Sequence, residues 1–202
     1  MQKTKVVVFD FDNTLYMGID WTKEWAEFCE KGLRFVFRDW DDKRFEKMIK
    51  DENLVNYTSD GIIKVIQKYG KNVEDWITFR TINDCDLDYS NVISISEDVL
   101  KSFANNFKLY IVSNSTHKDI EDMAFRFDID LSLFKEIIIN DYKHGAGKKY
   151  FYEEIIKKEK IKPSELFVIG DSENNDVIPA LELGARGKVV KDCNFKMEDF
   201  DL

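Results

Sequence analysis

Short apolar runs recur along the chain, and they predict the strands of a parallel β-sheet. The runs are continuously apolar rather than alternating, and β-branched residues dominate them. Strands of this kind are typical of a parallel sheet that is covered by helices on both faces. The expected strands are residues 5–9, 108–112, 136–139, 166–169 and 188–190.

Helical spacing of apolar residues fills the segments between these strands. Ile120, Ala124 and Phe127 recur on one helical face, and Thr116 is a plausible N-terminal cap for that helix. Further apolar faces occur at residues 152–156 and 177–184. The alternation of strand and helix from about residue 93 onwards predicts βαβ units and a Rossmann-like α/β core.

The segment from Tyr16 to about residue 92 departs from this alternation, because no convincing strand is found in it. Its apolar residues follow helical spacing instead, Gly70 reads as a helix stop, and the tryptophans of the chain all lie here. We expect a small all-helical insert, entered through a hinge at Tyr16–Gly18. The predicted division is residues 1–16 and 93–202 for the core and residues 17–92 for the helical cap.

Composition narrows the class of protein. The 202 residues include 30 Lys+Arg and 39 Asp+Glu, for a formal net charge of -9, which argues against nucleic-acid or anionic-membrane binding. No apolar stretch approaches the roughly 18 residues of a membrane span. Three widely spaced cysteines without a CxxC motif fit neither a disulfide framework nor a zinc site. The first apolar run is too short for a signal peptide, so we expect a cytoplasmic protein.

Two aspartates stand directly after the first expected strand. Asp10 and Asp12 follow four apolar residues in the sequence VVVFDFDNTL. In open parallel sheets, ligands bind beyond the carboxyl ends of the strands. Carboxylates at this place can bind a hard cation, or act as nucleophile and general acid/base, or form a solvated turn. The position directly after a buried strand favours the functional interpretations.

A second strand also ends in acidic residues. Asp171 follows the expected strand at residues 166–169, and Asp176 comes five residues later. If the two strands are neighbours, Asp10, Asp12 and Asp171 converge. Packed carboxylates repel one another unless a cation lies among them, so the pattern predicts a divalent metal site.

Two further positions suit the binding of an anion. Ser113 and Asn114 end the strand at residues 108–112, where a hydroxyl and backbone N–H groups can hold anionic oxygens. Lys148 stands at the start of an expected helix, and a helix N-terminus itself favours anions. The alternative for Lys148 is a solvated surface lysine.

Taken in this order, the motifs resemble those of the haloacid dehalogenase (HAD) superfamily. The resemblance covers residues 5 to about 190, and the helical insert resembles the cap of one division of that family. One departure is Lys148-Lys149, where many relatives have Lys-Pro, so Lys149 stays an alternative. The matching residues are Asp10, Asp12 and Thr14 in DxDxT, then Ser113, then Lys148, then Asp171 and Asp176 in GDSxxxD.

The resemblance implies a Mg²⁺-dependent reaction at phosphorus. Mg²⁺ would be held by the carboxylates of Asp10 and Asp171 and by the backbone carbonyl of Asp12. Asp10 would attack phosphorus to form an aspartyl-phosphate, and Asp12 would act as general acid and then as general base. The presence of Asp12 favours phosphoryl transfer over carbon–halogen cleavage.

The remaining residues take supporting roles under the same resemblance. Ser113, Asn114 and Lys148 would bind the transferring phosphoryl oxygens, and Asp176 would orient Lys148 or a metal-bound water. The implied activity is hydrolysis of a small phosphorylated metabolite. A phosphomutase with the same motifs and a non-catalytic binding protein of the same fold are the alternatives.

Overall fold

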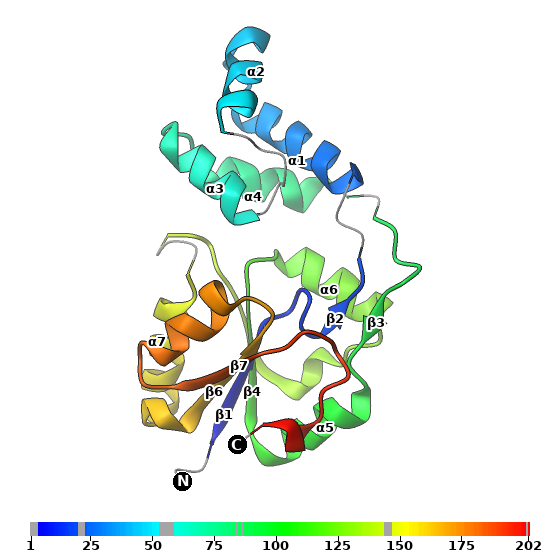
Figure 1. The fold of residues 1–202 in the computed structure, drawn as a ribbon, viewed down its shortest axis with the longest axis vertical. Helices are drawn as coiled ribbons and strands as arrows, with labels where there is room; N and C mark the ends of the chain where they lie inside the picture. Colours follow the sequence, from blue (N-terminus) through cyan, green and yellow to red (C-terminus); the bar gives the residue numbers. More distant parts are fainter. Residues whose placement is uncertain are drawn as a thin grey trace. The chain divides into compact units, whose positions relative to one another are not determined.

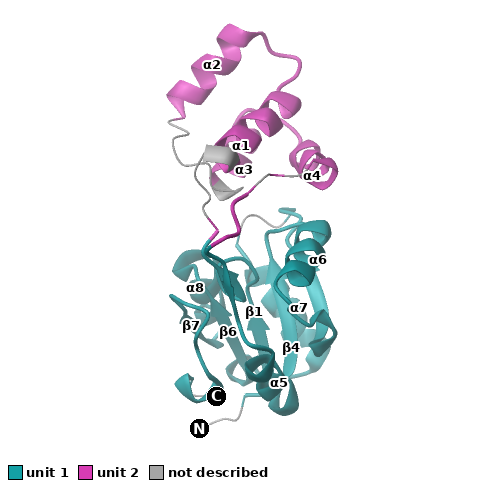
Figure 2. Ribbon diagram, turned by 90° about the vertical axis from the view of Figure 1, so that its right-hand side faces the viewer, with its two compact units in different colours: residues 1–18, 91–202 teal, residues 19–90 magenta. Residues whose placement is uncertain are grey.

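The computed structural model describes residues 4–19, 23–52, 59–83, 85, 87–143, 147–200 and 202. The chain forms two compact units (Figure 2). Unit 1 comprises residues 1–18 and 91–202, and unit 2 comprises residues 19–90. The sequence places these boundaries after residues 16 and 92. That unit 2 works as a cap stays a prediction.

Unit 1 is built on a parallel sheet, five-stranded within the described residues, with the order β5-β4-β1-β6-β7 (Figure 1). The central strand β1 pairs with β4 on one side and with β6 on the other. The Rossmann-like α/β fold predicted from the sequence is confirmed. The strands are β1 (Val6–Phe9), β4 (Lys108–Ser113), β5 (Phe134–Ile139), β6 (Leu166–Gly170) and β7 (Arg186–Val189).

Helices cover both faces of this sheet, which explains why its central strands β1 and β6 are continuously apolar. Val6 and Val8 of β1 pack in one core cluster with Tyr152 of α7. Phe9 points to the other face, where its ring centroid lies 5.3 Å from that of Phe103 in α5. The helices of unit 1 are α5 (Glu97–Asn106), α6 (His117–Arg126), α7 (Lys149–Glu159) and α8 (Ile178–Leu181).

The predicted cap of α6 is confirmed in detail. Thr116 Oγ1 accepts a hydrogen bond from Asp119 N at 3.1 Å, and Asp119 Oδ2 accepts one from Thr116 N at 3.0 Å. The helix expected over residues 177–184 is different. The chain first forms a π-helical turn at Glu173–Val177, followed by the short helix α8. A π turn holds an extra residue, which lets Asp176 turn inward.

A short antiparallel ribbon stands where the chain leaves unit 1 and returns to it. β2 (Tyr16–Met17) pairs with β3 (Ile93–Ser94). The expectation of no strand from Tyr16 onwards is therefore wrong for β2, because two residues are too few to show a pattern. Gly18 follows with φ +98, and a Cβ there would lie 2.4 Å from Asn91 O, so only glycine fits this turn.

Unit 2 is helical throughout its described elements, as its apolar spacing predicts. The helix α4 was not expected, because apolar and polar residues are mixed along it. Trp76 and Phe79 of α4 are buried against α1, where Gly32 leaves room for the Trp76 ring. Trp21 lies outside the described residues. The helices are α1 (Lys23–Val36), α2 (Asp42–Asp51), α3 (Ser59–Lys68) and α4 (Val73–Ile82).

None of the described helices combines the length and the apolar character that a membrane-crossing helix needs.

Candidate active site

Asp10 emerges from the sheet at the carboxyl end of its central strand. The preceding residues of β1 are fully buried, and Asp10 itself is only 8% exposed. Its backbone N–H donates to Ile169 O of β6 at 2.8 Å, which fixes the chain next to that strand. The sheet therefore holds the Asp10 carboxylate at the edge where parallel α/β folds bind ligands.

Lys148 reaches this carboxylate from the start of α7. Its ammonium donates to Asp10 Oδ1 at 2.5 Å and to Asp176 Oδ1 at 2.6 Å. The Lys148 side chain is 2% exposed, whereas that of Lys149 is 44% exposed and pairs with Glu182 at 2.9 Å. Of the two adjacent lysines, Lys148 is the one that lies among the acidic residues.

Three carboxylates converge around this ammonium. Ligand oxygens of Asp10, Asp171 and Asp176 lie within 4.8 Å of one another. Asp10 and Asp171 come from the adjacent strands β1 and β6, as the sequence analysis anticipated. Three carboxylates facing one ammonium leave an excess of negative charge in a buried space, and such a donor set fits a hard divalent cation.

The pKa values of the cluster reflect this excess. Burial raises the pKa of Asp10 well above its usual value, against the opposing effect of Lys148. Burial and then the Asp176 carboxylate also raise the pKa of Asp171. Burial alone would lower the pKa of Lys148, but Asp10 and Asp176 outweigh it and hold that pKa well above its usual value. Lys148 is therefore a permanent cation at this site.

Gly170 is required for Asp176 to take its place. A Cβ at Gly170 would lie 2.3 Å from Asp176 Oδ2, a distance that real Cβ atoms do not show. Asp176 is 1% exposed, and its Oδ2 accepts a hydrogen bond from Ser172 N at 3.0 Å. The glycine of the GDSxxxD motif thus makes room for the last carboxylate of the same motif.

We expect Gly170→Ala to destabilise the protein by about 1–3 kcal/mol, because the methyl group displaces a buried, hydrogen-bonded carboxylate. Chemical denaturation measures this loss. Gly147→Ala is the matched control, since a Cβ at Gly147 has no neighbour within 4 Å among the described residues. Equal stability of the two variants would contradict the close packing of Asp176 on Gly170.

The Asp12 carboxylate is bound by hydroxyl groups instead of by Lys148. Tyr16 Oη donates to Asp12 Oδ1, and Ser115 Oγ donates to Asp12 Oδ2 at 2.5 Å. Ser113 Oγ lies 3.5 Å from the same Oδ2. Burial and then the charge of Asp12 raise the pKa of Tyr16 well above its usual value, so the phenol keeps its proton and remains a donor.

Ser113 ends β4 beside Asp12, and Asn114 begins the loop that follows. Ser113 is fully buried, and its Oγ accepts a hydrogen bond from Ser115 N at 3.0 Å. Asn140, at the end of β5, donates from Nδ2 to Asn114 Oδ1 at 3.0 Å and from its backbone N to Ser113 O at 2.8 Å. The loop is therefore fixed by the neighbouring strand.

The structure brings Ser113, Lys148 and the predicted residues of both acidic motifs to the carboxyl edge of one sheet. Sequence reasoning missed three residues there: Tyr16, which it assigned only to a hinge, and Ser115 and Asn140. The signal in the sequence is weak, because a hydroxyl two residues after Ser113 or an Asn after a strand is common in loops.

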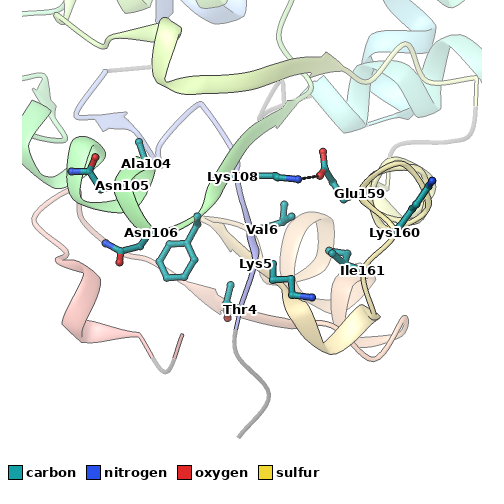
Figure 3. A pocket seen from close by; sticks show the side chains of 11 residues that line it. Thr4, Lys5, Val6, Ala104, Asn105, Asn106, Lys108, Glu159, Lys160 and Ile161 are labelled. Carbon is teal, nitrogen blue, oxygen red and sulfur yellow. Dashed lines mark hydrogen bonds and ion pairs between the residues drawn. The ribbon is translucent and has the colours of Figure 1, made fainter.

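A hollow of about 550 Å³ lies at the opposite edge of the sheet, between the starts of β1 and β4 and the end of α7 (Figure 3). Glu159 lines it and accepts hydrogen bonds from Lys108, Lys135 and Tyr110. Burial by itself raises the pKa of Glu159, but these hydrogen bonds outweigh burial and lower that pKa to about 2. Because its acidic group is fully paired and it lies far from the Asp10 cluster, this hollow gives no support to a catalytic role.

The family of the chain follows from a comparison with family models. The model described as a haloacid dehalogenase-like hydrolase matches residues 4–184. The chain belongs to the haloacid dehalogenase-like hydrolases. The match spans both acidic motifs and the lysine of this HAD hydrolase, so the resemblance seen in the sequence is confirmed. None of the curated proteins matches the chain significantly.

Solved structures of other HAD proteins share the fold. A HAD family enzyme of Bacteroides thetaiotaomicron, in complex with magnesium and inorganic phosphate, has a TM-score of 0.55 at 16% identity over 98% of this chain and 99% of that one. A HAD phosphatase of Thermococcus onnurineus has a TM-score of 0.54 at 17% identity, over 93% and 86% of the two chains. A predicted phosphoglycolate phosphatase of Haemophilus somnus 129PT has a TM-score of 0.53 at 16% identity, over 98% of this chain and 92% of that one.

Proposed function

We propose that this HAD hydrolase is a Mg²⁺-dependent phosphatase that hydrolyses a small phosphomonoester through an aspartyl-phosphate on Asp10. The observation that carries the proposal is the ion pair of Asp10 with the buried Lys148, set within a cluster of three carboxylates. One carboxylate would then attack phosphorus, one cation would bind a phosphoryl oxygen, and the surplus of carboxylates suits a metal ion.

The carboxylates of Asp10 and Asp171 would hold the Mg²⁺, together with the backbone carbonyl of Asp12. The Asp12 carboxylate is oriented by the hydroxyl groups of Tyr16 and Ser115, so its backbone carbonyl is the group that would contact the metal. When bound, Mg²⁺ supplies positive charge that lets an anionic phosphate approach an anionic carboxylate. The relative from Bacteroides thetaiotaomicron, which was solved with magnesium and inorganic phosphate, supports this choice of metal and ligand.

Asp10 then performs the first displacement. Its carboxylate oxygen forms a bond to phosphorus while the bond from phosphorus to the leaving oxygen breaks, and protonated Asp12 gives its proton to that oxygen. In the second displacement, Asp12 takes a proton from a water molecule whose oxygen attacks phosphorus. The bond between Asp10 and phosphorus breaks, so inorganic phosphate and the free carboxylate are released.

Lys148 and the loop after β4 would bind the phosphoryl group during both displacements. The Lys148 ammonium neutralises charge that builds up on the phosphoryl oxygens, while Asp176 keeps that ammonium beside Asp10. Ser113, whose Oγ lies 3.5 Å from Asp12 Oδ2, would offer a hydroxyl, and Asn114 would offer a backbone N–H group. Each group is buried or fixed by hydrogen bonds, so little reorganisation precedes the reaction.

Hydrolysis of p-nitrophenyl phosphate tests the proposal. We expect release of inorganic phosphate that requires added Mg²⁺, and loss of at least about 99% of the rate with excess chelator, because the Asp10 and Asp171 charges then repel the substrate. Restoring Mg²⁺ should restore the rate. Full activity in chelator would contradict the metal requirement, and absence of phosphate release with Mg²⁺ across a panel of phosphorylated metabolites would contradict the phosphatase.

A further inference from the structure

The Asp12 carboxylate is held from two sides by hydroxyl donors that belong to none of the motifs of the family resemblance. Tyr16 Oη binds Oδ1, and Ser115 Oγ binds Oδ2 at 2.5 Å. A carboxylate can accept about four hydrogen bonds, two on each oxygen. Tyr16 on Oδ1, and Ser115 with the longer Ser113 contact at 3.5 Å on Oδ2, therefore fix the orientation of the group and still leave Oδ1 able to meet a leaving group or a water molecule.

Both donors are themselves rigidly placed. The Tyr16 ring is 1% exposed, and its centroid lies 5.3 Å from that of Phe11 and 5.2 Å from that of Phe127. Its backbone pairs with Ser94 in the β2–β3 ribbon. Ser115 is 6% exposed, and its backbone N–H is bound to Ser113 Oγ. The Tyr16 hydroxyl therefore cannot move away from Asp12 without disturbing packed rings, and the backbone of Ser115 is fixed beside Asp12.

We propose that Tyr16 and Ser115 are positioning residues which together hold the Asp12 carboxyl group in the orientation in which its protonated form gives a proton to the leaving group. The inference rests on the proposed function, in which Asp12 is the general acid and base. Proton transfer requires the donor and acceptor atoms to be within hydrogen-bond reach in a defined direction. Without the two hydroxyl groups, the Asp12 side chain is free to rotate into other rotamers, and the fraction in the productive one falls.

The predicted effect depends on the leaving group. p-Nitrophenolate leaves with little need for a proton, whereas unsubstituted phenolate and alkoxides need one. The value of kcat/KM reports the steps up to departure of the leaving group. We expect Tyr16→Phe and Ser115→Ala each to lower kcat/KM for phenyl phosphate by about tenfold, a part of the 10²–10⁴-fold range of general acid catalysis, and to leave that for p-nitrophenyl phosphate within about twofold.

Tyr110→Phe is the matched control. Tyr110 is also fully buried and also donates its hydroxyl to a carboxylate, but this carboxylate is Glu159 at the opposite edge of the sheet. The same chemical change there is expected to affect the melting temperature and to lower neither kcat/KM value. Inhibition by inorganic phosphate should be unchanged in all three variants, because the groups that bind phosphate remain.

The decisive comparison is the ratio of kcat/KM for p-nitrophenyl phosphate to that for phenyl phosphate. A ratio that rises in Tyr16→Phe and Ser115→Ala but not in Tyr110→Phe supports the inference. An unchanged ratio, or faster turnover of phenyl phosphate, would overturn it. If Tyr16→Phe does not fold, Ser115→Ala alone decides.

The Asp12→Asn variant distinguishes failure of this inference from failure of the proposed function. If Asp12→Asn also leaves the ratio unchanged, the role of Asp12 in the proposed function is wrong. If the ratio rises in Asp12→Asn alone, only the roles of Tyr16 and Ser115 are contradicted.

Discussion

Asp10→Asn is expected to lower turnover of p-nitrophenyl phosphate by about 10⁴-fold or more, a loss comparable to that from removing a nucleophile in other covalent mechanisms. An amide oxygen carries no negative charge and cannot form a stable acyl-phosphate. Steady-state assays with added Mg²⁺ measure this loss of turnover. Asp122→Asn is the matched control, because Asp122 is an exposed residue of α6 whose carboxylate pairs with Lys118 at 3.2 Å.

The same substitution should not weaken the fold. Burial and neighbouring carboxylates raise the pKa of Asp10. The ionised form of Asp10 therefore makes the folded protein less stable than a neutral side chain at this position would. The amide has nearly the same shape and relieves repulsion from Asp171 and Asp176. In excess chelator, we expect the melting temperature of Asp10→Asn to be at least that of the wild type. Residual turnover near the wild-type rate would contradict the nucleophile.

The second large effect is expected for Lys148→Ala. Removing this ammonium leaves Asp10 and Asp176 without their shared cation, and loss of one partner of a buried ion pair costs about 3–5 kcal/mol of stability. Turnover should fall by about 10²–10³-fold, because charge on the transferring phosphoryl group is less stabilised. Denaturation in chelator and kinetics at saturating Mg²⁺ separate the two effects.

Lys149→Ala is the natural control for this experiment. Lys149 is the next residue, but its half-exposed ammonium pairs with Glu182 on the surface. We expect a change in stability within about 0.5 kcal/mol and little change in rate. The reverse pattern would assign the phosphate-binding role to Lys149, and mild effects from both substitutions would show that this loop does not bind the phosphoryl group.

The sheet was predictable because burial on both faces leaves a strong mark on the sequence. Strands such as β1 and β6 are apolar at every position, and the acidic residues that follow them point to the ligand-binding edge. The sequence could not show whether these two strands are neighbours in the sheet. In the structure β1 pairs with β6, and this pairing brings Asp10 and Asp171 together.

Other features could not be predicted, because they depend on contacts between distant residues. β2 and β3 are two residues long, and α4 is held by burial of Trp76 against α1 instead of by a regular apolar face. In the π turn before α8, Asp176 lies against Gly170 and bonds to Lys148, contacts that a local sequence pattern does not reveal. Likewise, nothing in the spacing of Tyr16 and Asp12 shows that the phenol binds the carboxylate.

A crystal structure with Mg²⁺ and beryllium fluoride tests the central claim most directly, since this anion mimics a phosphoryl group on a carboxylate. The account predicts a beryllium–oxygen bond to Asp10, with fluorine atoms bound by Lys148 and by the loop at Ser113, and with the metal on Asp10 and Asp171. Binding of beryllium fluoride to Asp12, to Asp171 or to no carboxylate at all would contradict Asp10 as the nucleophile.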